Sequence, residues 1–104
     1  MPWNKDEVIK TTLKWGGLKE LPTNSEIITL EKRGSIFTRQ FIIEFVSSEN
    51  EIKNWIKKSK RLKNNQPKSD TNKMIYEIYP GEDDSFGGKV EIKKDTVKIN
   101  MSWS

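Results

Sequence analysis

A run of basic residues between Lys53 and Lys73 is the part of this sequence whose side chains could most directly do chemistry. The run holds eight lysines and arginines against one acid, Asp70, so its local charge is +7, whereas the whole chain of 104 residues carries +4. Positive charge at this density can bind nucleic acid phosphates, anionic lipid or an acidic protein. The candidate binding residues are Lys53, Lys57, Lys58, Lys60, Arg61 and Lys63.

The same residues have a simpler interpretation as a solvated helix surface. Lysines at helical spacing opposite Ile52 and Ile56 would keep the outer face of an amphipathic helix in water. Cations near a helix C-terminus are also favourable in any protein. Lysine dominates over arginine, and no known nucleic-acid motif accompanies the run. Both interpretations remain, and we take polyanion binding as the alternative rather than the first expectation.

A second candidate is the acidic loop from Gly81 to Gly88, in which Glu82, Asp83 and Asp84 are consecutive. Carboxylates of this kind can hold Ca²⁺ or Mg²⁺. However, the alternation of ligands that an EF-hand loop needs is missing, and neighbouring side chains on an extended backbone point in different directions. We therefore predict a solvent-exposed connection here, with no metal site and no cofactor.

Cysteine and histidine are both absent from the sequence. The chain therefore has no disulfide framework, no thiolate nucleophile, no cysteine zinc site and no imidazole base. Carboxylate, lysine, tyrosine or an oxygen-bound metal would be left for catalysis, and no nucleophile with a matching base can be identified. We expect no enzyme but a noncatalytic binding or protein-interaction module, with a protein as its partner. The alternative is an electrostatic binder of nucleic acid or anionic surfaces through residues 53–73.

The elements that would position these groups are clearest between Ile36 and Leu62, where the hydrophobic period changes from two to nearly four. Alternating apolar residues up to Phe45 predict a strand with one apolar face. Ser48 and Glu51 then form a capping box, which is typical of a helix start. The helix is predicted to present one apolar face, made of Ile52, Trp55, Ile56, Ser59 and Leu62.

Three elements precede this segment in our prediction. They are a helix from Lys5 to Lys14 that Gly16-Gly17 stops, a strand from Ile27 to Lys32 and a hairpin turn at Arg33-Gly34-Ser35. Four large residues are assigned to the core, namely Trp55, Phe41, Ile43 and Phe45, whereas Tyr79 and Phe86 are placed at the surface.

The segment from Lys63 to Asn72 has almost no apolar residues, and we predict a mobile loop there. A strand from Met74 to Tyr79 follows. A last hairpin with Lys94-Asp95 at its tip would place Ile92 opposite Val97 and Val90 opposite Ile99, and Met101 and Trp103 would continue the same side.

These elements predict an α+β fold in a single domain, residues 1–104. The expected architecture is an antiparallel sheet of about five strands with two helices on one face, in the order α-β-β-α-β-β-β. A chain of this length suffices for one core but not for two. No stretch has the length and apolarity of a membrane span.

Five short stretches carry a resemblance to known sequences, namely Leu21 to Ile27, Phe37 to Arg39, Trp55 to Ser59, Tyr79 to Glu82, and Trp103-Ser104. They resemble a group of small, uncharacterised bacterial α+β proteins, many of them predicted envelope lipoproteins. The resemblance implies a similar element order over residues 5–104, but no activity and no catalytic residues. This chain differs in having neither a leader nor a lipid-bearing cysteine. We therefore expect a cytoplasmic location for the chain as written, and the cell envelope if a leader has been removed.

Overall fold

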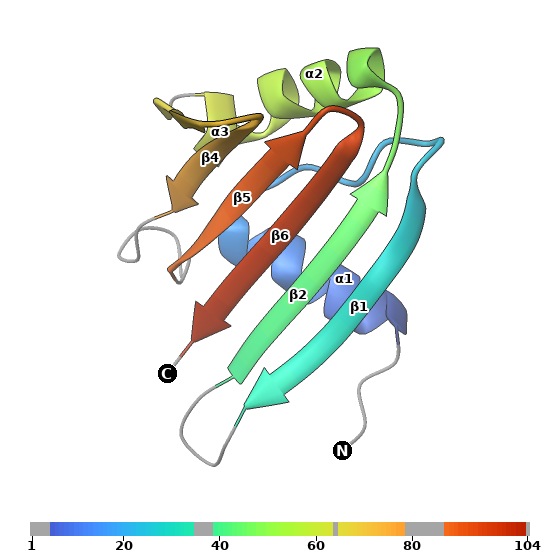
Figure 1. Cartoon of the computed structure of the whole chain (residues 1–104). Helices are drawn as coiled ribbons and strands as arrows, with labels where there is room; N and C mark the ends of the chain where they lie inside the picture. The colour runs from blue at the N-terminus through green and yellow to red at the C-terminus, as the bar shows by residue number, and fades with distance from the viewer. Residues whose placement is uncertain (1–4, 35–38, 64, 79–86, 104) are drawn as a thin grey trace.

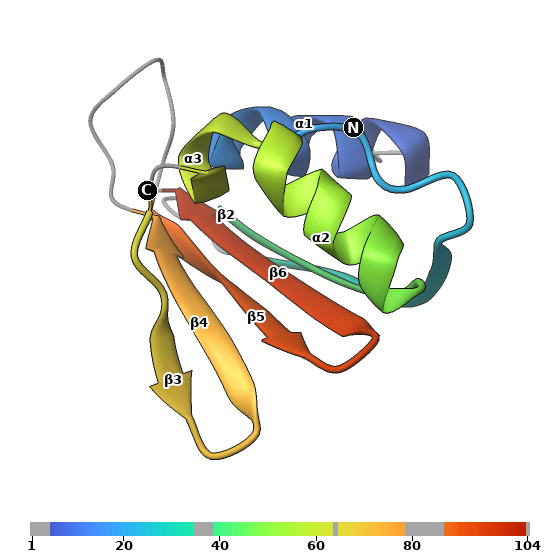
Figure 2. The same ribbon diagram turned by 90° about the horizontal axis from the view of Figure 1, so that it is seen from above.

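The computed structural model describes residues 5–34, 39–63, 65–78 and 87–103 of the chain. Within these ranges, six antiparallel strands form one sheet, and the helices lie on one of its faces (Figures 1 and 2). The elements are α1 (Lys5–Gly16), β1 (Glu26–Gly34), β2 (Arg39–Val46), α2 (Glu49–Lys58), α3 (Lys60–Lys63), β3 (Lys68–Asp70), β4 (Lys73–Ile78), β5 (Gly88–Lys93) and β6 (Thr96–Trp103). The prediction of an α+β fold with an antiparallel sheet is confirmed.

The strands are arranged in the order β1-β2-β6-β5-β4-β3. After the β1–β2 pair, the chain crosses the sheet face through α2 and α3 and reaches the far edge at β3 (Figure 1). It then returns strand by strand until β6 pairs with β2 along residues 39–46 and 96–103. The C-terminal strand therefore joins the two halves of the sheet.

Helix α1 ends where the sequence predicted a stop, although it runs two residues beyond Lys14. The N–H of Leu18 donates to the Leu13 carbonyl at 2.9 Å, and the N–H of Gly17 donates to the Lys14 carbonyl at 3.2 Å. This is the Schellman arrangement, which needs a left-handed residue after the helix. Gly17 supplies it with a φ of 62°.

Helix α2 begins as predicted, because the Ser48 hydroxyl accepts a hydrogen bond of 3.1 Å from the N–H of Glu51. The prediction that the helix continues to Leu62 is wrong. Helix α2 ends at Lys58, Ser59 is extended (φ −86°, ψ 112°), and α3 forms a separate turn. The buried Ser59 hydroxyl accepts a hydrogen bond of 3.0 Å from the N–H of Lys19. Such a long-range contact is invisible to hydrophobic periodicity.

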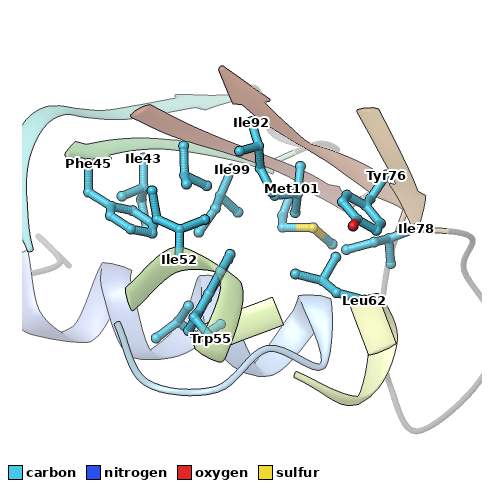
Figure 3. Packing of buried hydrophobic residues seen from close by; sticks show 13 residues of the cluster. Ile43, Phe45, Ile52, Trp55, Leu62, Tyr76, Ile78, Ile92, Ile99 and Met101 are labelled. Carbon is cyan, nitrogen blue, oxygen red and sulfur yellow. The ribbon is translucent and has the colours of Figure 1, made fainter. Parts of the chain in front are cut away.

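The core lies between the helices and the inner face of the sheet (Figure 3). All four predicted core residues are buried, and the rings of Phe45 and Trp55 meet edge to face with centroids 5.5 Å apart. The predicted register of the last hairpin is confirmed by the pairs Ile92 with Val97 and Val90 with Ile99. Met101 continues the buried side, whereas the side chain of Trp103 lies outside the described part of the structure.

The sheet has one strand more than the five predicted, because part of the segment predicted as a mobile loop is a strand. β3 pairs with β4, and the side-chain amide of Asn65 donates a hydrogen bond of 2.6 Å to the backbone carbonyl of Glu77. All three residues of β3 are exposed. A short edge strand is held by backbone hydrogen bonds, so it needs no apolar side chains and leaves no hydrophobic signal.

Several other predictions fall at or beyond the limits of the described residues. Arg33 and Gly34 belong to β1 and not to the predicted turn at Arg33-Gly34-Ser35, and Ser35 lies outside the described residues. Gly88, predicted as the end of the acidic loop, begins β5. The remainder of that loop up to Phe86, the predicted surface residue Tyr79, and the predicted strand residues 36–38 lie outside the described residues.

Candidate binding groove

The helices cover the inner face of β4 at one end only. Moving along that face, Ile78 is 3% exposed and Tyr76 is 6% exposed, but Met74 is 41% exposed. Leu62 of α3 packs over the covered end, where it joins Tyr76 and Ile78 in the core cluster (Figure 3). The apolar face of the strand therefore remains uncovered toward the β3–β4 turn.

A groove of about 420 Å³ occupies this uncovered region, between α2 on one side and the β3–β4 hairpin with the end of β5 on the other. We call it the hairpin groove. Apolar side chains from three elements line it, namely Ile52 and Ile56 of α2, Met74 of β4 and Ile92 of β5. Met74 is the most exposed of these, and the flexible methionine side chain adapts readily to different partners.

Three lysines and one acid also line the hairpin groove, namely Lys53, Lys73, Lys94 and Glu49. The Lys73 ammonium lies 3.6 Å from the Glu91 carboxylate. By contrast, no hydrogen bond or ion pair joins the side chain of Lys53 or Lys94 to another residue in the described part of the chain. The groove therefore combines an apolar floor with two cations that are available to a ligand.

Two tight turns form the open end of the hairpin groove. Thr71 follows β3 with a φ of 47°, and Lys94 follows β5 with a φ of 55°. Both values lie in the left-handed region, which residues other than glycine, asparagine and aspartate rarely adopt. Lys94 and Lys53 thus line the groove from different elements, the β5–β6 turn and α2.

The six basic residues predicted as a binding site do not all face one surface. Lys53 lines the hairpin groove, whereas Lys58 lines a different groove on the other side of α2. Lys57, Lys60 and Lys63 are exposed, and the side chain of Arg61 lies outside the described part of the structure. The sequence run therefore surrounds α2 and α3, and its local charge of +7 is spread over several directions.

The second groove lies between α2 and residues 19–23, and it encloses about 370 Å³. Here the helix is held in place by the backbone of Lys19. The Trp55 indole N–H donates to the Lys19 carbonyl at 2.9 Å, and the Lys19 N–H donates to the Ser59 hydroxyl at 3.0 Å. Trp55 of α2 and Ser59, the residue after the helix, thus satisfy the backbone C=O and N–H of Lys19. These two hydrogen bonds fix the position of the helix over the sheet.

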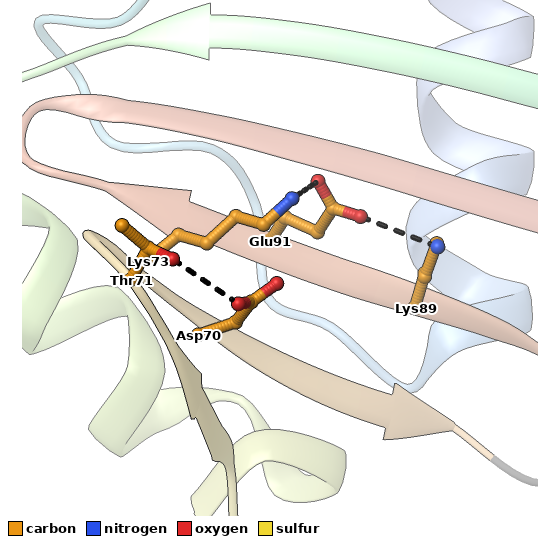
Figure 4. A network of polar contacts seen from close by, with 5 residues as sticks. All are labelled: Asp70, Thr71, Lys73, Lys89 and Glu91. Carbon is orange, nitrogen blue, oxygen red and sulfur yellow. Dashed lines mark hydrogen bonds and ion pairs between the residues drawn. The ribbon is translucent and has the colours of Figure 1, made fainter.

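A shallow hollow of about 520 Å³ lies on the opposite, helix-free face of the sheet, where acidic and basic side chains alternate. Glu91 contacts Lys89 at 3.3 Å and Lys73 at 3.6 Å (Figure 4). Partial burial acts to raise the pKa of Glu91, but the hydrogen bonds and positive charges of these lysines outweigh it and lower the pKa. The carboxylate therefore serves as a paired anion, and its lowered pKa makes it a weak proton acceptor.

The residues that matter most to the hairpin groove were not among the predicted site residues, apart from Lys53. Met74 was predicted only as the first residue of a strand, and Lys94 only as part of a turn. The available signal was the position of Met74 on the apolar side of its strand, beyond the reach of the predicted helix. Their proximity to Lys53 depends on the crossover from β2 to β3, which local sequence patterns do not contain.

None of the described helices is long and apolar enough to cross a membrane. Likewise, no group of three or more acidic residues within these ranges is arranged to hold a metal ion. Comparisons with protein-family models, with curated proteins and with solved structures found no match, so the resemblance to small, uncharacterised bacterial α+β proteins stays a prediction.

Proposed function

We propose that this protein is a noncatalytic binding module that receives a segment of a protein partner in the hairpin groove. The observation that carries the proposal is the exposure of Met74, at the end of an apolar strand face that is otherwise covered. Of the large hydrophobic side chains described, only Met74 and Ile28 are exposed. An exposed apolar surface with polar residues at its rim is typical of protein interaction sites.

The chemistry around the groove supports a noncatalytic role. Ser69 and Thr71 provide the hydroxyl groups among its described lining residues, and the chain has no imidazole to activate them. Tyr76 is another candidate for catalysis, but it is buried, and burial raises the pKa of its hydroxyl. A hydroxyl of this kind stays protonated at neutral pH and is a poor nucleophile or base.

Selection from a random 12-residue peptide library displayed on phage tests the proposal. We expect the protein to enrich peptides that no longer bind a Met74→Asp variant, because a carboxylate placed on the apolar floor opposes burial of an apolar side chain. Ile28→Asp provides the matched control, since Ile28 is 54% exposed and lies on β1 at the opposite edge of the sheet. Peptides that bind both variants as well as the parent protein would contradict the proposal.

A second candidate function is binding to nucleic acid or another anionic surface through the outer side of α2 and α3. The specific observation that favours it is that Lys57, Lys58 and Lys63 are exposed and make no ion pair with another described residue. A titration with a short DNA duplex at increasing salt tests this function, because release of counterions makes phosphate binding strongly dependent on salt. Absence of binding at low salt would exclude it.

A further inference from the structure

We infer that the segment received by the hairpin groove is acidic and amphipathic, with apolar side chains on the groove floor and carboxylates beside Lys53 and Lys94. This inference rests on the proposed function and specifies the chemistry of the partner. Its basis is the positive charge that two separate elements bring to the edge of an apolar floor.

The two cations lie on separate elements. Lys53 belongs to the second turn of α2, and Lys94 belongs to the β5–β6 turn. A segment lying on the floor of the groove would meet positive charge from both elements. Carboxylates on such a segment gain two charge-assisted contacts without rearrangement of an existing ion pair, because neither lysine is paired with another described residue.

The other charged residues that line the groove weaken the positive electrostatic field of Lys53 and Lys94 without reversing its sign. Glu49 lies one helical turn before Lys53 and offsets part of its charge. Lys73 keeps its contact with Glu91 on the other face of the sheet, so its charge is already partly neutralised. Cations thus outnumber acids around the groove, and the field favours an acidic partner over a basic one.

The floor of the groove requires apolar side chains from the partner as well. Met74 and Ile56 present hydrocarbon and sulfur surface in the same groove as the two lysines. A nucleic acid backbone has nothing apolar to place there, and its bases would find no aromatic ring among the described residues that line the groove. A neutral peptide would cover the floor, but it would desolvate two ammonium groups without giving them new hydrogen-bond partners. An acidic amphipathic segment satisfies both requirements.

The experiment reverses the charge of the groove and tests whether the charge of the peptides selected from the library reverses with it. One variant carries Lys53→Glu and Lys94→Glu. Its matched control carries Lys57→Glu and Lys63→Glu, which change the net charge equally but lie outside the residues that line the groove. The same random 12-residue phage library is selected on the parent protein, the groove variant and the control. Circular dichroism establishes that all three are folded.

We expect peptides enriched on the parent and on the control to be rich in aspartate and glutamate next to apolar residues. Peptides enriched on the groove variant should instead contain lysine and arginine next to apolar residues. The most enriched acidic peptide, labelled with fluorescein, should bind the groove variant at least about tenfold more weakly, and the control within about twofold of the parent.

Each other outcome overturns a specific statement. Peptides that depend on Met74 but show no acidic preference would overturn this inference while leaving the proposed function intact. Acidic peptides that are lost equally on the groove variant and the control would show a general electrostatic attraction and would also overturn it. The absence of any peptide that depends on Met74 would overturn the proposed function together with the inference.

Discussion

Trp55 is the residue that connects the helix layer, the sheet and the segment after α1. Its ring packs against Phe45 of β2 at 87°, and its indole N–H donates to the Lys19 carbonyl. Its position on the apolar face of a helix was predictable from the spacing after Ser48. Its polar contact was not, because it joins residues 36 positions apart. Local patterns thus predict burial, whereas the hydrogen bond depends on the completed fold.

Replacing Trp55 by alanine is expected to leave the protein largely unfolded or strongly destabilised. Truncation of a buried tryptophan typically lowers the free energy of unfolding by about 3 to 5 kcal/mol, a large fraction of the stability of a small domain. Urea denaturation followed by circular dichroism measures the loss, with Lys57→Ala as the exposed control on the same helix. If the alanine variant unfolds like the parent but no longer binds peptides, Trp55 is a binding residue instead of a core residue.

Glu91 gives a prediction that depends on pH. Its pKa is lowered in the folded protein, so its carboxylate contributes stability above the ordinary titration range of glutamate and loses that contribution as the pH falls through the folded-state pKa. Glu91→Gln should therefore lower the free energy of unfolding slightly at neutral pH, and the difference should disappear in acid. Urea denaturation at pH 7 and at about pH 3 measures both values.

The control for this measurement is Glu26→Gln on β1, because Glu26 is exposed and has no ion pair with another described residue. Glu26→Gln should not show the pH-dependent loss of unfolding free energy that is expected of Glu91→Gln. A Glu91→Gln effect that persists unchanged in acid would show that lost packing, and not lost charge, causes it.

At the scale of secondary structure, the sequence predicts elements whose stability is local and misses those that depend on distant partners. The Ser48 N-cap, which is one half of the predicted capping box, and the glycine stop after α1 are local, and both are confirmed. The apolar spacing through Leu62 wrongly predicted one continuous helix, whereas α2 ends at Lys58 and the extended Ser59 accepts a long-range hydrogen bond from Lys19. β3 is held by pairing with the edge of β4 and has no buried residue, so its polar composition wrongly suggested a loop.

The start of β5 provides a test of packing between strands. A Cβ atom added at Gly88 would lie 2.3 Å from the Asn100 carbonyl oxygen and 2.6 Å from the Met101 sulfur. Gly88→Ala should therefore lower the free energy of unfolding by about 1 to 3 kcal/mol, the usual cost of overpacking. Thermal unfolding measures the change, and Lys93→Ala at the exposed end of the same strand serves as control. Equal melting temperatures for the two variants would contradict this account of the close approach.

At the scale of the whole molecule, the crossover from β2 to β3 creates the hairpin groove. It carries α2 over the centre of the sheet and places the β3–β4 hairpin at the far edge, beyond the helix (Figure 2). The sequence predicted the apolar face of the helix, the last hairpin and the cationic Lys53. It did not predict that Met74 would remain uncovered, since that depends on where the helix lies across the sheet.

The distribution of positive charge over the molecule distinguishes the two candidate functions. If the protein binds polyanions, replacing Lys57, Lys58, Lys60 and Arg61 by glutamine should weaken binding to duplex DNA and reduce its dependence on salt concentration. Fluorescence anisotropy over a range of salt concentrations measures both quantities. Under the groove proposal, the same four substitutions leave binding of the enriched acidic peptide nearly unchanged, because Lys57, Lys58 and Lys60 are not among the described residues that line the hairpin groove.

The most direct test of the central claim is to map where a peptide binds by nuclear magnetic resonance. The ¹⁵N-labelled full chain is titrated with the most enriched peptide, and shifts of its backbone amide signals are followed. The groove account predicts that the largest shifts occur at Ile56, Ser69, Met74 and Ile92, which line the groove from four different elements. Shifts confined to the outer side of α2 and α3 around Lys57 and Lys63, or to the helix-free sheet face around Glu91, would contradict it.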